Sequence, residues 1–591
     1  MKWDGKGDLG RDILSGNILN KHIFERTIQL YLESLKVTNM SKQLNIIKPQ
    51  ISIDEYKTFW KKKKEETATS PFRLHIGHYK AALQKDHIIN VHRIMLLIPF
   101  QTALVPNRWK KTVQTMLEKD PGHPWIHRLR IIELFDSQVN AGFQIFIGRK
   151  MVWSAVERNK LHESSYGSTP GKMAASAILQ KVLCVDQLKL ERRAGGMFDC
   201  DATGCYDRII PPFASLHLQA LGLASSIATF LARLIFVMER HVKTKHGISK
   251  ESIKTTKNQP LLGIGQGNGG GPAIWLAHLT VMFTALSSIC KGFTTRCVNG
   301  KKKLCTVGTG YVDDVTLLVT TKYSEEQTET QVKKRIKRMA KTWEKILHTT
   351  GGKLELSKCF WIPITWGWKK GRLKMRNKGR HPTELKIKES ESGNKVRIKR
   401  ISPIVAEKRL GVQYSLDGKW KEEYKHWKRY SKNFADQISK ARLDRINGYH
   451  AYSTLWCSKF RYSCPVLGWN ESQLSKVQKT IIGKSLSAAG YNSKMPRAVV
   501  FGPSQYGGME WDSAIGILIY EQLKMLMGSL RLGDKVGKLL TIQLTWLQLI
   551  AGIETPILEE TKQLRFLPNI WLTKLRDKLR NLNITIELGQ C

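Results

Sequence analysis

The residues best suited to metal chemistry are two pairs of carboxylates. Asp313 and Asp314 are adjacent in GTGYVDDVTLLV, and Asp199 and Asp201 lie two apart in GGMFDCDA, while residues 252–312 contain no Asp or Glu. Because apolar, strand-forming residues flank each pair, we expect Asp313 and Asp314 at the tight turn of a hairpin, and Asp199 and Asp201 on one side of a strand. Adjacent carboxylates repel, so such a turn needs a cation or an arginine nearby.

Carboxylates that converge from two β elements suit Mg²⁺, which takes oxygen ligands and shares its coordination sphere with water and substrate phosphates. Two such ions about 4 Å apart hold the attacking and leaving oxygens of a phosphoryl transfer. In a basic protein this combination indicates a nucleic-acid polymerase or a nuclease. A solvated surface loop is the alternative, and the YVDD sequence alone would favour it.

Charge and composition narrow the class of protein. The 591 residues include 96 Lys and Arg against 49 Asp and Glu, a net charge of +47, and 41% hydrophobic residues, which is enough to build packed cores. The excess predicts a polyanionic partner, with nucleic acid favoured over an anionic membrane. The uncharged segment 272–290 is near the length of a membrane span, but its polar residues and the glycine-rich loop before it favour a buried helix.

Cysteine usage and the N-terminus indicate the compartment. The ten cysteines include no CxxC pair and no Cys/His spacing typical of a zinc site. The N-terminal MKWDGKGDLGRD has neither an apolar signal core nor an amphipathic transit pattern. We therefore expect reduced thiols and a nuclear or cytoplasmic protein.

Hydrophobic periodicity predicts the elements that position the carboxylates. Two glycines open the short strand MFDCDA. A helix with a capping box formed by Ser324 and Gln327 carries its apolar residues on one face. ELKIKES and NKVRIKRI predict a basic hairpin within residues 369–400. Helices are also expected over residues 20–37, over most of 80–195, and after 420.

Three motifs, in this order, resemble motifs A, B and C of reverse transcriptases: DATGCYD with Asp201, Tyr206 and Asp207, GIGQGNGGGP with Gln266 and Gly267, and YVDD at Tyr311 to Asp314. SPFRLHIGHYKAAL and YGSTPGKMAASAI resemble two blocks of the non-LTR (LINE-like) retroelement type, GGKLELSKC resembles motif D, and KRLGVQYSLDG resembles the primer-grip motif E. The resemblance covers residues 70–440. The chain departs from the family pattern in QGNGGGP, and at Thr169 where the family has Arg.

The resemblance implies an α+β right-hand polymerase fold with fingers, a palm built on an antiparallel sheet, and a helical thumb. Residues 1–64 would form an N-terminal helical extension and residues 65–194 the fingers. Residues 195–420 would form the palm, with a basic insert at 369–400, and residues 421–591 the thumb and a C-terminal extension.

The resemblance also implies a metal site. Asp201 and Asp313 would be the main ligands of two Mg²⁺ ions, which Mn²⁺ can replace. Asp314 would lie beside them as a third catalytic carboxylate, and the backbone carbonyl of Ala202 would join the ligands.

Nucleotide and primer residues follow from the same resemblance. Tyr206 would lie under the sugar and exclude a ribose 2′-hydroxyl. The other residues implied to contact the nucleotide are Gln266, Gly267, Lys119, Arg130 and Lys358. The residues implied to contact primer or template are Tyr311, Leu410 and Gly411. Asp207 is expected to be structural.

The implied function is that of an RNA-directed DNA polymerase of a retrotransposon, with an RNA template, a DNA primer and dNTPs as partners and no membrane. A primer 3′-hydroxyl activated by one Mg²⁺ would attack the α-phosphate of a dNTP, and the second ion would stabilise the leaving pyrophosphate. Basic residues over 332–341, 369–400 and 421–445 would hold the nucleic-acid backbones. The alternatives are a non-catalytic or maturase-like RNA-binding protein with the same fold, a telomerase, and an RNA-dependent RNA polymerase.

Overall fold

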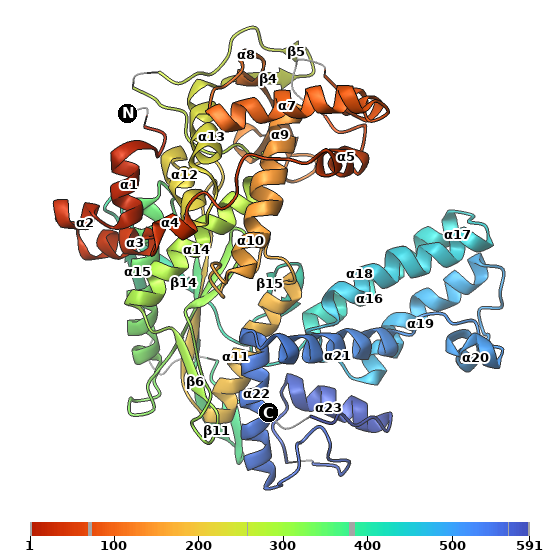
Figure 1. Cartoon of the computed structure of the whole chain (residues 1–591). Coiled ribbons are helices and arrows are strands. Elements are labelled where there is room, and N and C mark those ends of the chain that lie inside the picture. Colours follow the sequence, from red (N-terminus) through yellow and green to blue (C-terminus); the bar gives the residue numbers. More distant parts are fainter. Residues whose placement is uncertain are drawn as a thin grey trace.

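The computed structural model describes residues 3–68, 74–123, 125–256, 258–377, 384–564 and 566–588. Residues 70–73 of the SPFRLHIGHYKAAL block and residues 378–383 of the basic insert lie outside the described residues. The chain is 49% helix and 14% strand, so the predicted α+β class is confirmed. Figure 1 shows a long body from which an arm of helices, α16 to α21, extends to one side.

A six-stranded sheet forms the centre of the body. Its strands, in spatial order, are β13 (Leu385–Lys388), β14 (Lys395–Arg400), β10 (Phe360–Ile364), β3 (Gly195–Cys200), β9 (Asp314–Thr320) and β8 (Gly308–Tyr311). Neighbouring strands are antiparallel except β10 and β14, which are parallel. The expectation of an antiparallel sheet is therefore wrong at this edge. The predicted basic hairpin exists as β13 and β14, and it extends the sheet instead of standing apart from it.

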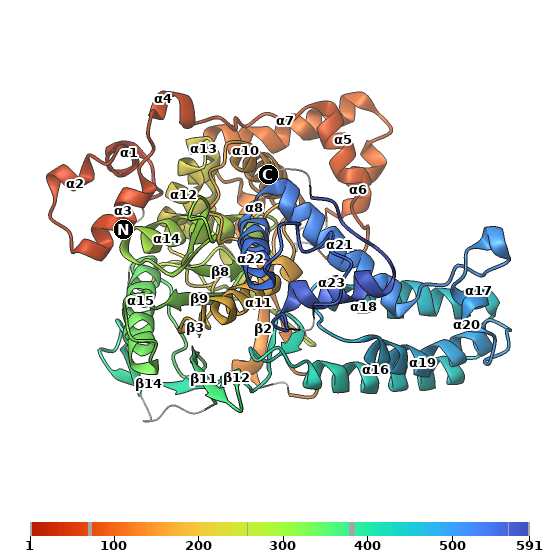
Figure 2. The same ribbon diagram turned by 90° about the horizontal axis from the view of Figure 1, so that it is seen from below.

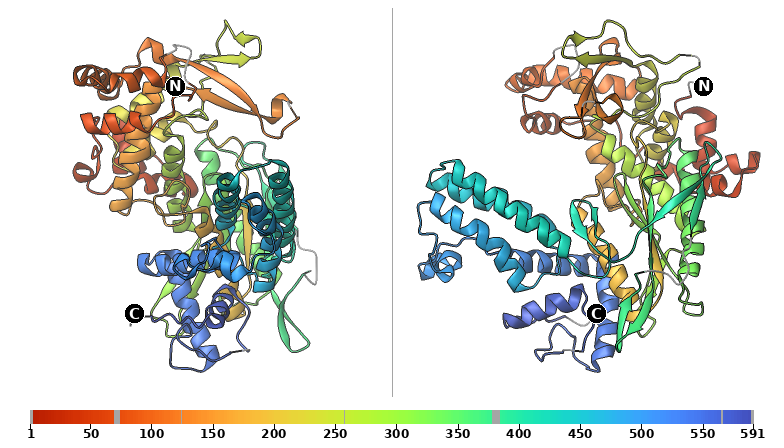
Figure 3. Two further views of the ribbon diagram at one scale, coloured as in Figure 1. Left: turned by 90° about the vertical axis from the view of Figure 1, so that its right-hand side faces the viewer. Right: turned by 180° about the vertical axis from the view of Figure 1, so that it is seen from behind.

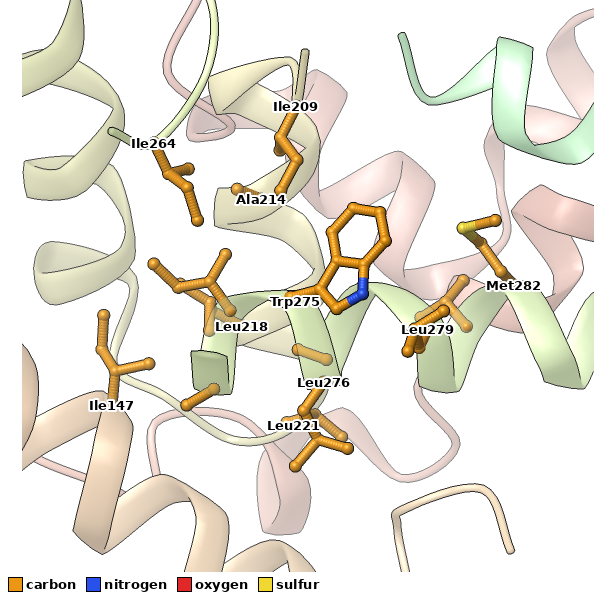
Figure 4. Close-up of a cluster of buried hydrophobic side chains, with 14 of the residues drawn as sticks. Ile147, Ile209, Ala214, Leu218, Leu221, Ile264, Trp275, Leu276, Leu279 and Met282 are labelled. Atoms are coloured by element: carbon orange, nitrogen blue, oxygen red, sulfur yellow. The ribbon is translucent and has the colours of Figure 1, made fainter. Parts of the chain in front are cut away.

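Two helices cover one face of this sheet. Phe198 and Leu317, which pair across β3 and β9, share a hydrophobic core with Ile336 of α15 (Glu329–Thr349) and with α14 (Gly271–Ile289). Figure 4 shows the α14 part of this core, where Trp275 and Leu276 lie among side chains from neighbouring helices. α14 is long and apolar enough to cross a membrane, but 72% of its apolar window is buried inside the protein, as predicted for a core helix.

The opposite face of the sheet belongs to a second core. Met197 and Leu318 also pair across β3 and β9, and they pack with α11 (Ala174–Glu191), α21 (Ala514–Leu532) and α22 (Lys535–Ala551). Because side chains alternate along a strand, Asp199 and Asp201 lie on the same side as Met197. The carboxylates therefore face α11 and the arm, with α14 and α15 behind them.

A second sheet lies in the upper part of the body in Figure 1. It contains β2 (Leu129–Leu134), β1 (Lys111–Glu118), β4 (Glu239–Thr244) and β5 (Gly247–Ile248), with β1 and β4 parallel and the other pairs antiparallel. The expectation that residues 80–195 are mostly helical missed the β1–β2 hairpin. The body also contains the helices α5 (Ile53–Lys61), α6 (Ile76–Ala82), α7 (Asp86–Thr102), α8 (Asn107–Lys110), α9 (Ser137–Phe143), α10 (Val152–Glu157), α12 (Pro211–Ala220) and α13 (Ser225–Val237), and α8 contacts β1.

Four short N-terminal helices pack on the side of the body away from the arm, as Figures 1 and 2 both show. They are α1 (Gly7–Ser15), α2 (Ile18–Lys21), α3 (Arg26–Leu35) and α4 (Met40–Gln43). The single helix expected over residues 20–37 is thus limited to α3 and the end of α2. The predicted capping box is also wrong, because Thr328 caps α15 by accepting from the Gln331 N–H.

The arm is helical, as expected after residue 420, and Figure 3 shows it from the side and from behind. Its helices are α16 (Lys421–Lys440), α17 (Arg445–His450), α18 (Ser458–Ser463), α19 (Glu471–Ala488), α20 (Arg497–Phe501) and α21, and α23 (Trp571–Asn581) packs near its base. The described structure also contains three small hairpins: β6 (Phe293–Arg296) with β7 (Lys303–Thr306), β11 (Trp366–Lys369) with β12 (Arg372–Met375), and β15 (Glu407–Arg409) with β16 (Val412–Tyr414).

Candidate functional site

The carboxylates predicted to be catalytic meet at one corner of the central sheet. β3 pairs antiparallel with β9, and continuing their register by one residue places Asp201 opposite Asp314. β8 and β9 form a tight hairpin in which Tyr311 pairs with Asp314, and Val312 and Asp313 form the turn. The predicted strand and the predicted YVDD hairpin are both confirmed. The strand is β3, and it lies next to β9 of the hairpin.

The Asp313 carboxyl is held in negative surroundings. Its side chain keeps contact with solvent. Crowding by protein atoms nevertheless desolvates it and raises its pKa above the ordinary value, and the charges of Asp314 and Asp201 add to the rise. The positive charge of Arg130 partly offsets them. These carboxylates therefore lie close enough to repel one another, a repulsion that a bound cation would relieve.

Asp201 and Asp314 each have a lysine as neighbour. Lys358 Nζ lies 3.7 Å from Asp201 Oδ2, but both side chains are well exposed, so this pair is weak. Lys181 Nζ on α11 lies 3.6 Å from Asp314 Oδ1, and Lys181 is only 1% exposed. Within the part of the chain that the structure describes, this ammonium has no hydrogen-bond partner. Asp314 is thus the counter-charge of a buried lysine, whereas Asp201 and Asp313 stay open to the solvent side.

Asp199 has a structural role. Arg409 Nη2 lies 2.9 Å from Asp199 Oδ2, and both side chains are nearly buried. The Thr316 hydroxyl donates to Asp199 Oδ1 at 2.5 Å. Burial alone would lower the pKa of Arg409, but Asp199, Tyr414 and Asp314 together raise it above the ordinary value. Asp199 does share a strand face with Asp201 as predicted, but its oxygens are occupied by protein groups.

A divalent cation fits the remaining carboxylates as an open site. Among the described residues, no three His, Cys, Asp or Glu side chains form a ready-made metal cluster. Mg²⁺ needs only one or two carboxylates when water and substrate phosphates complete its sphere. Asp201 and Asp313 supply hard oxygens of that kind. Ala202 follows Asp201 and forms an isolated β-bridge with Leu354. This bridge fixes the backbone of Ala202, whose carbonyl was predicted to be a further metal ligand.

Tyr206 lies beside this carboxylate corner. Burial raises the pKa of its phenol above the ordinary value, and the charges of Cys205 and Asp313 contribute. Its ring centroid is 6.2 Å from that of Trp275 on α14. A Cβ added to Gly271 would lie 3.7 Å from the Tyr206 ring, in ordinary contact. The structure therefore brings Tyr206 into the same site as Asp313.

The glycine-rich loop before α14 lies against the second sheet. The Gln266 carbonyl accepts a hydrogen bond from the Glu133 N–H at 2.6 Å. Gly267 has a φ of +120°, and a Cβ there would lie 2.4 Å from the Glu133 carbonyl oxygen, so only glycine fits. Glu133 is buried and pairs with Arg240 at 3.4 Å. The loop is thereby fixed to β2, the strand that carries Arg130.

Lys119 and Arg130, both predicted to contact the nucleotide, lie in the β1–β2 hairpin, and their charges act on different carboxylates. The charge of Arg130, which lies opposite Leu117, offsets part of the rise in the pKa of Asp313. Desolvation raises the pKa of Asp207, and the charges of Arg240 and Lys119 oppose that rise. Arg130 is therefore part of the carboxylate corner, and Lys119 lies at its edge.

The residues predicted to contact primer or template gather around Tyr462 of α18. Leu410 and Gly411 form the turn between β15 and β16, and the Tyr462 hydroxyl donates to the Leu410 carbonyl at 2.6 Å. A Cβ on Gly411 would lie 3.2 Å from the Tyr462 ring. Burial raises the pKa of Tyr462, with contributions from the nearby Tyr311 and Asp314. The β15–β16 turn, the YVDD hairpin and the arm therefore meet here.

Residues 164–167 cover the free edge of the YVDD hairpin. The Gly310 N–H donates to the Ser164 carbonyl, and the Tyr166 N–H donates to the Gly310 carbonyl, both at 2.8 Å. A Cβ on Gly167 would lie 2.5 Å from the Val312 nitrogen, so glycine is required for this close approach. The start of the YGSTPGK block thus packs against the turn that carries Asp313.

Replacing Gly167 by Ala is expected to destabilise the protein by about 1–3 kcal/mol, because the added methyl overpacks against the backbone of the turn. The urea unfolding midpoint measures this. Gly528→Ala is the matched control: it lies within α21 with no atom within 4 Å of an added Cβ, and it should be neutral or stabilising by up to about 1 kcal/mol. Equal midpoints for Gly167→Ala and the wild type would show that the close approach is absent in solution.

Four side chains of this site were missed by the sequence reasoning: Lys181, Trp275, Arg409 and Tyr462. Arg409 stands next to the predicted Leu410, so its charge beside the motif E turn was a usable signal. Lys181, the one charged residue of the mostly apolar run ILQKVLCV, was another. Trp275 and Tyr462 lie in ordinary helical patterns with no signal of their own.

Neither kind of comparison with known proteins adds to this description. No protein-family model matches the chain, and no curated protein matches it in sequence.

Proposed function

We propose that this protein is an RNA-directed DNA polymerase of the non-LTR retrotransposon type. The observation that carries the proposal is the meeting of Asp201, Asp313 and Tyr206 at one corner of a sheet, in the order and setting that the motif resemblance requires. In this proposal the central sheet is the palm, the β1–β2 region belongs to the fingers, and the arm is the thumb of a right-hand polymerase fold.

Asp201 and Asp313 would hold the metal ions, with the Ala202 carbonyl beside them. When bound, two Mg²⁺ ions would activate the primer 3′-hydroxyl and stabilise the charge on the leaving pyrophosphate. Arg130, whose charge already reaches Asp313, would approach the triphosphate of a dNTP from the fingers side. Lys358, 3.7 Å from Asp201, would lie on the other side of the same phosphates.

The template and primer would lie on the face of the sheet that carries the carboxylates. The β15–β16 turn and Tyr462 border this face, and α16 supplies exposed bases including Lys425, Lys428 and Lys432. Lys and Arg contacts to phosphates hold a backbone without reading its sequence. α15 lies behind the sheet, so its basic side chains do not reach a duplex at the carboxylates.

Primer extension on poly(rA) with an oligo(dT) primer, dTTP and Mg²⁺ tests the proposal. Extension by the wild-type chain supports it. RNA binding without any extension, in Mg²⁺ and in Mn²⁺, would contradict it and favour the non-catalytic RNA-binding protein. Extension with rNTPs as efficient as with dNTPs would instead favour an RNA-dependent RNA polymerase.

Replacing Tyr206 by Ala is expected to raise rNTP incorporation, because the ring that would block a 2′-hydroxyl beside Asp313 is removed. The measurement is the ratio of kcat/KM for dTTP to that for UTP. A lost steric contact of this size corresponds to a fall in the ratio of about 10–200-fold. Tyr506→Ala, at a side chain that is 83% exposed, is the control and should leave the ratio unchanged. An unaltered ratio in Tyr206→Ala would remove the residue from sugar selection.

A further inference from the structure

The turn that carries Asp313 has an unusual backbone. Val312 and Asp313 connect the paired residues Tyr311 and Asp314, and Val312 has a φ of +55°. Two-residue hairpin turns with a positive φ at the first central position normally have glycine, asparagine or aspartate there. A β-branched residue in this region is a strained outlier that persists only where its surroundings impose it.

The indole of Trp275 provides a specific restraint on that turn. Trp275 Nε1 donates a hydrogen bond to the Val312 carbonyl at 2.7 Å. Trp275 is only 3% exposed, so little water competes for this bond. The Gly167 backbone also lies close to Val312, because a Cβ added there would lie 2.5 Å from the Val312 nitrogen. The strained peptide is therefore held between α14 and residues 164–167.

Trp275 itself is fixed by a buried polar chain. Its ring stacks on His278 at a centroid distance of 5.2 Å and an interplanar angle of 28°. His278 forms hydrogen bonds with His217 at 3.1 Å and with the Thr350 hydroxyl at 3.0 Å. His217 in turn forms a hydrogen bond with the Tyr31 hydroxyl at 2.6 Å. These contacts support the ring whose indole N–H points toward Val312.

We infer that Trp275 is a positioning residue for Asp313: its indole N–H holds Val312 in the left-handed conformation and so aims the Asp313 carboxylate toward Asp201. The expected effect on catalysis rests on the proposed function. The restraint that Trp275 places on the Val312 backbone does not. Tyr206 packs against the same indole, so one side chain contacts both the metal-carrying turn and the residue proposed to select the sugar.

Trp275→Phe keeps an aromatic ring and removes only the donor, and it is compared with Trp275→Phe/Val312→Gly. Glycine adopts a positive φ without strain, so the second change should make the donor unnecessary. The matched control is Trp368→Phe, at an indole that is 63% exposed. The first readout is hydrogen exchange of the peptide 308–316 in the metal-free protein. The second is kcat and KM for dTTP in primer extension.

Trp275→Phe should speed exchange of the 308–316 peptide by about tenfold, as for the loss of one buried hydrogen bond. It should lower kcat about tenfold with KM nearly unchanged, because ground-state nucleotide binding is not its task. The Val312→Gly addition should restore kcat, and the control should match the wild type. Unchanged exchange, or a fall in kcat that the glycine fails to rescue, overturns the inference. A wild-type protein that extends no primer contradicts the proposed function alone, since hydrogen exchange still decides the restraint.

Discussion

Asp313→Asn should abolish primer extension and yet fold at least as stably as the wild type. Asparagine keeps the shape of the side chain but lacks the charge that would bind Mg²⁺. Losing several kcal/mol of metal stabilisation lowers the rate by about 10³-fold or more. The stability of Asp313→Asn should not fall, because desolvation and the neighbouring Asp314 and Asp201 disfavour the charged form of Asp313, as its raised pKa shows. Rates of dTTP incorporation and urea midpoints without metal measure the two effects.

The control for this prediction is Asp8→Asn, which removes an equally sized charge from the exposed first turn of α1. Asp8 pairs with Arg11 at 2.9 Å, and both side chains are well exposed, so the activity and the urea midpoint of Asp8→Asn should stay close to the wild-type values. Extension by Asp313→Asn at the wild-type rate would exclude the carboxylate from the reaction. A marked loss of stability in the same variant would show that Asp313 is instead a structural partner.

Arg409→Met should have the largest effect on stability, a loss of about 3–5 kcal/mol, because it leaves the nearly buried Asp199 carboxylate with Thr316 as its remaining partner. Methionine preserves most of the side-chain volume, so the loss reports the charge. The urea midpoint is the measurement. Adding Asp199→Asn should recover part of the loss, since the neutral amide no longer needs a buried counter-charge.

Arg397→Met is the matched control for Arg409→Met. Arg397 also pairs with a carboxylate, Glu384, but its side chain is 71% exposed, so its loss should cost less than about 1 kcal/mol. If Arg409→Met and Arg397→Met had equal midpoints, the burial of the Arg409 pair would not matter in solution. Failure of Asp199→Asn to recover any stability would indicate that Arg409 acts by packing.

Local patterns predicted the elements that carry the carboxylates, because strands flanked by glycines and a tight turn leave short-range signals. The MFDCDA strand, the YVDD hairpin and α14 all lie where they were expected. The β1–β2 hairpin was missed because Val113, Met116 and Leu117 are spaced three and four residues apart, the spacing of a helix face. The start of α15 was misplaced because Gln327 does not cap the helix and instead accepts from the Ala194 N–H at 2.8 Å.

The site depended on contacts that no local pattern contains. Asp199 and Asp201 are equivalent in sequence, and only the approach of Arg409, more than two hundred residues later, makes one structural and leaves the other open. In the same way, Lys181 distinguishes Asp314 from Asp313 across a helix–strand contact. Motif order could place these residues in one site, but the partners that assign their roles come from the tertiary fold.

The order of strands in the central sheet also bears on how the chain is made. β3 is synthesised first of the six, and each later strand or hairpin docks at an outer edge, so no strand has to enter between two that are already paired. At about 5–20 residues per second, the chain from Cys200 to Thr320 takes roughly 6–24 s to emerge. During that interval both edges of β3 lack the partners they have in the finished sheet, so the strand is open to pairing with other chains.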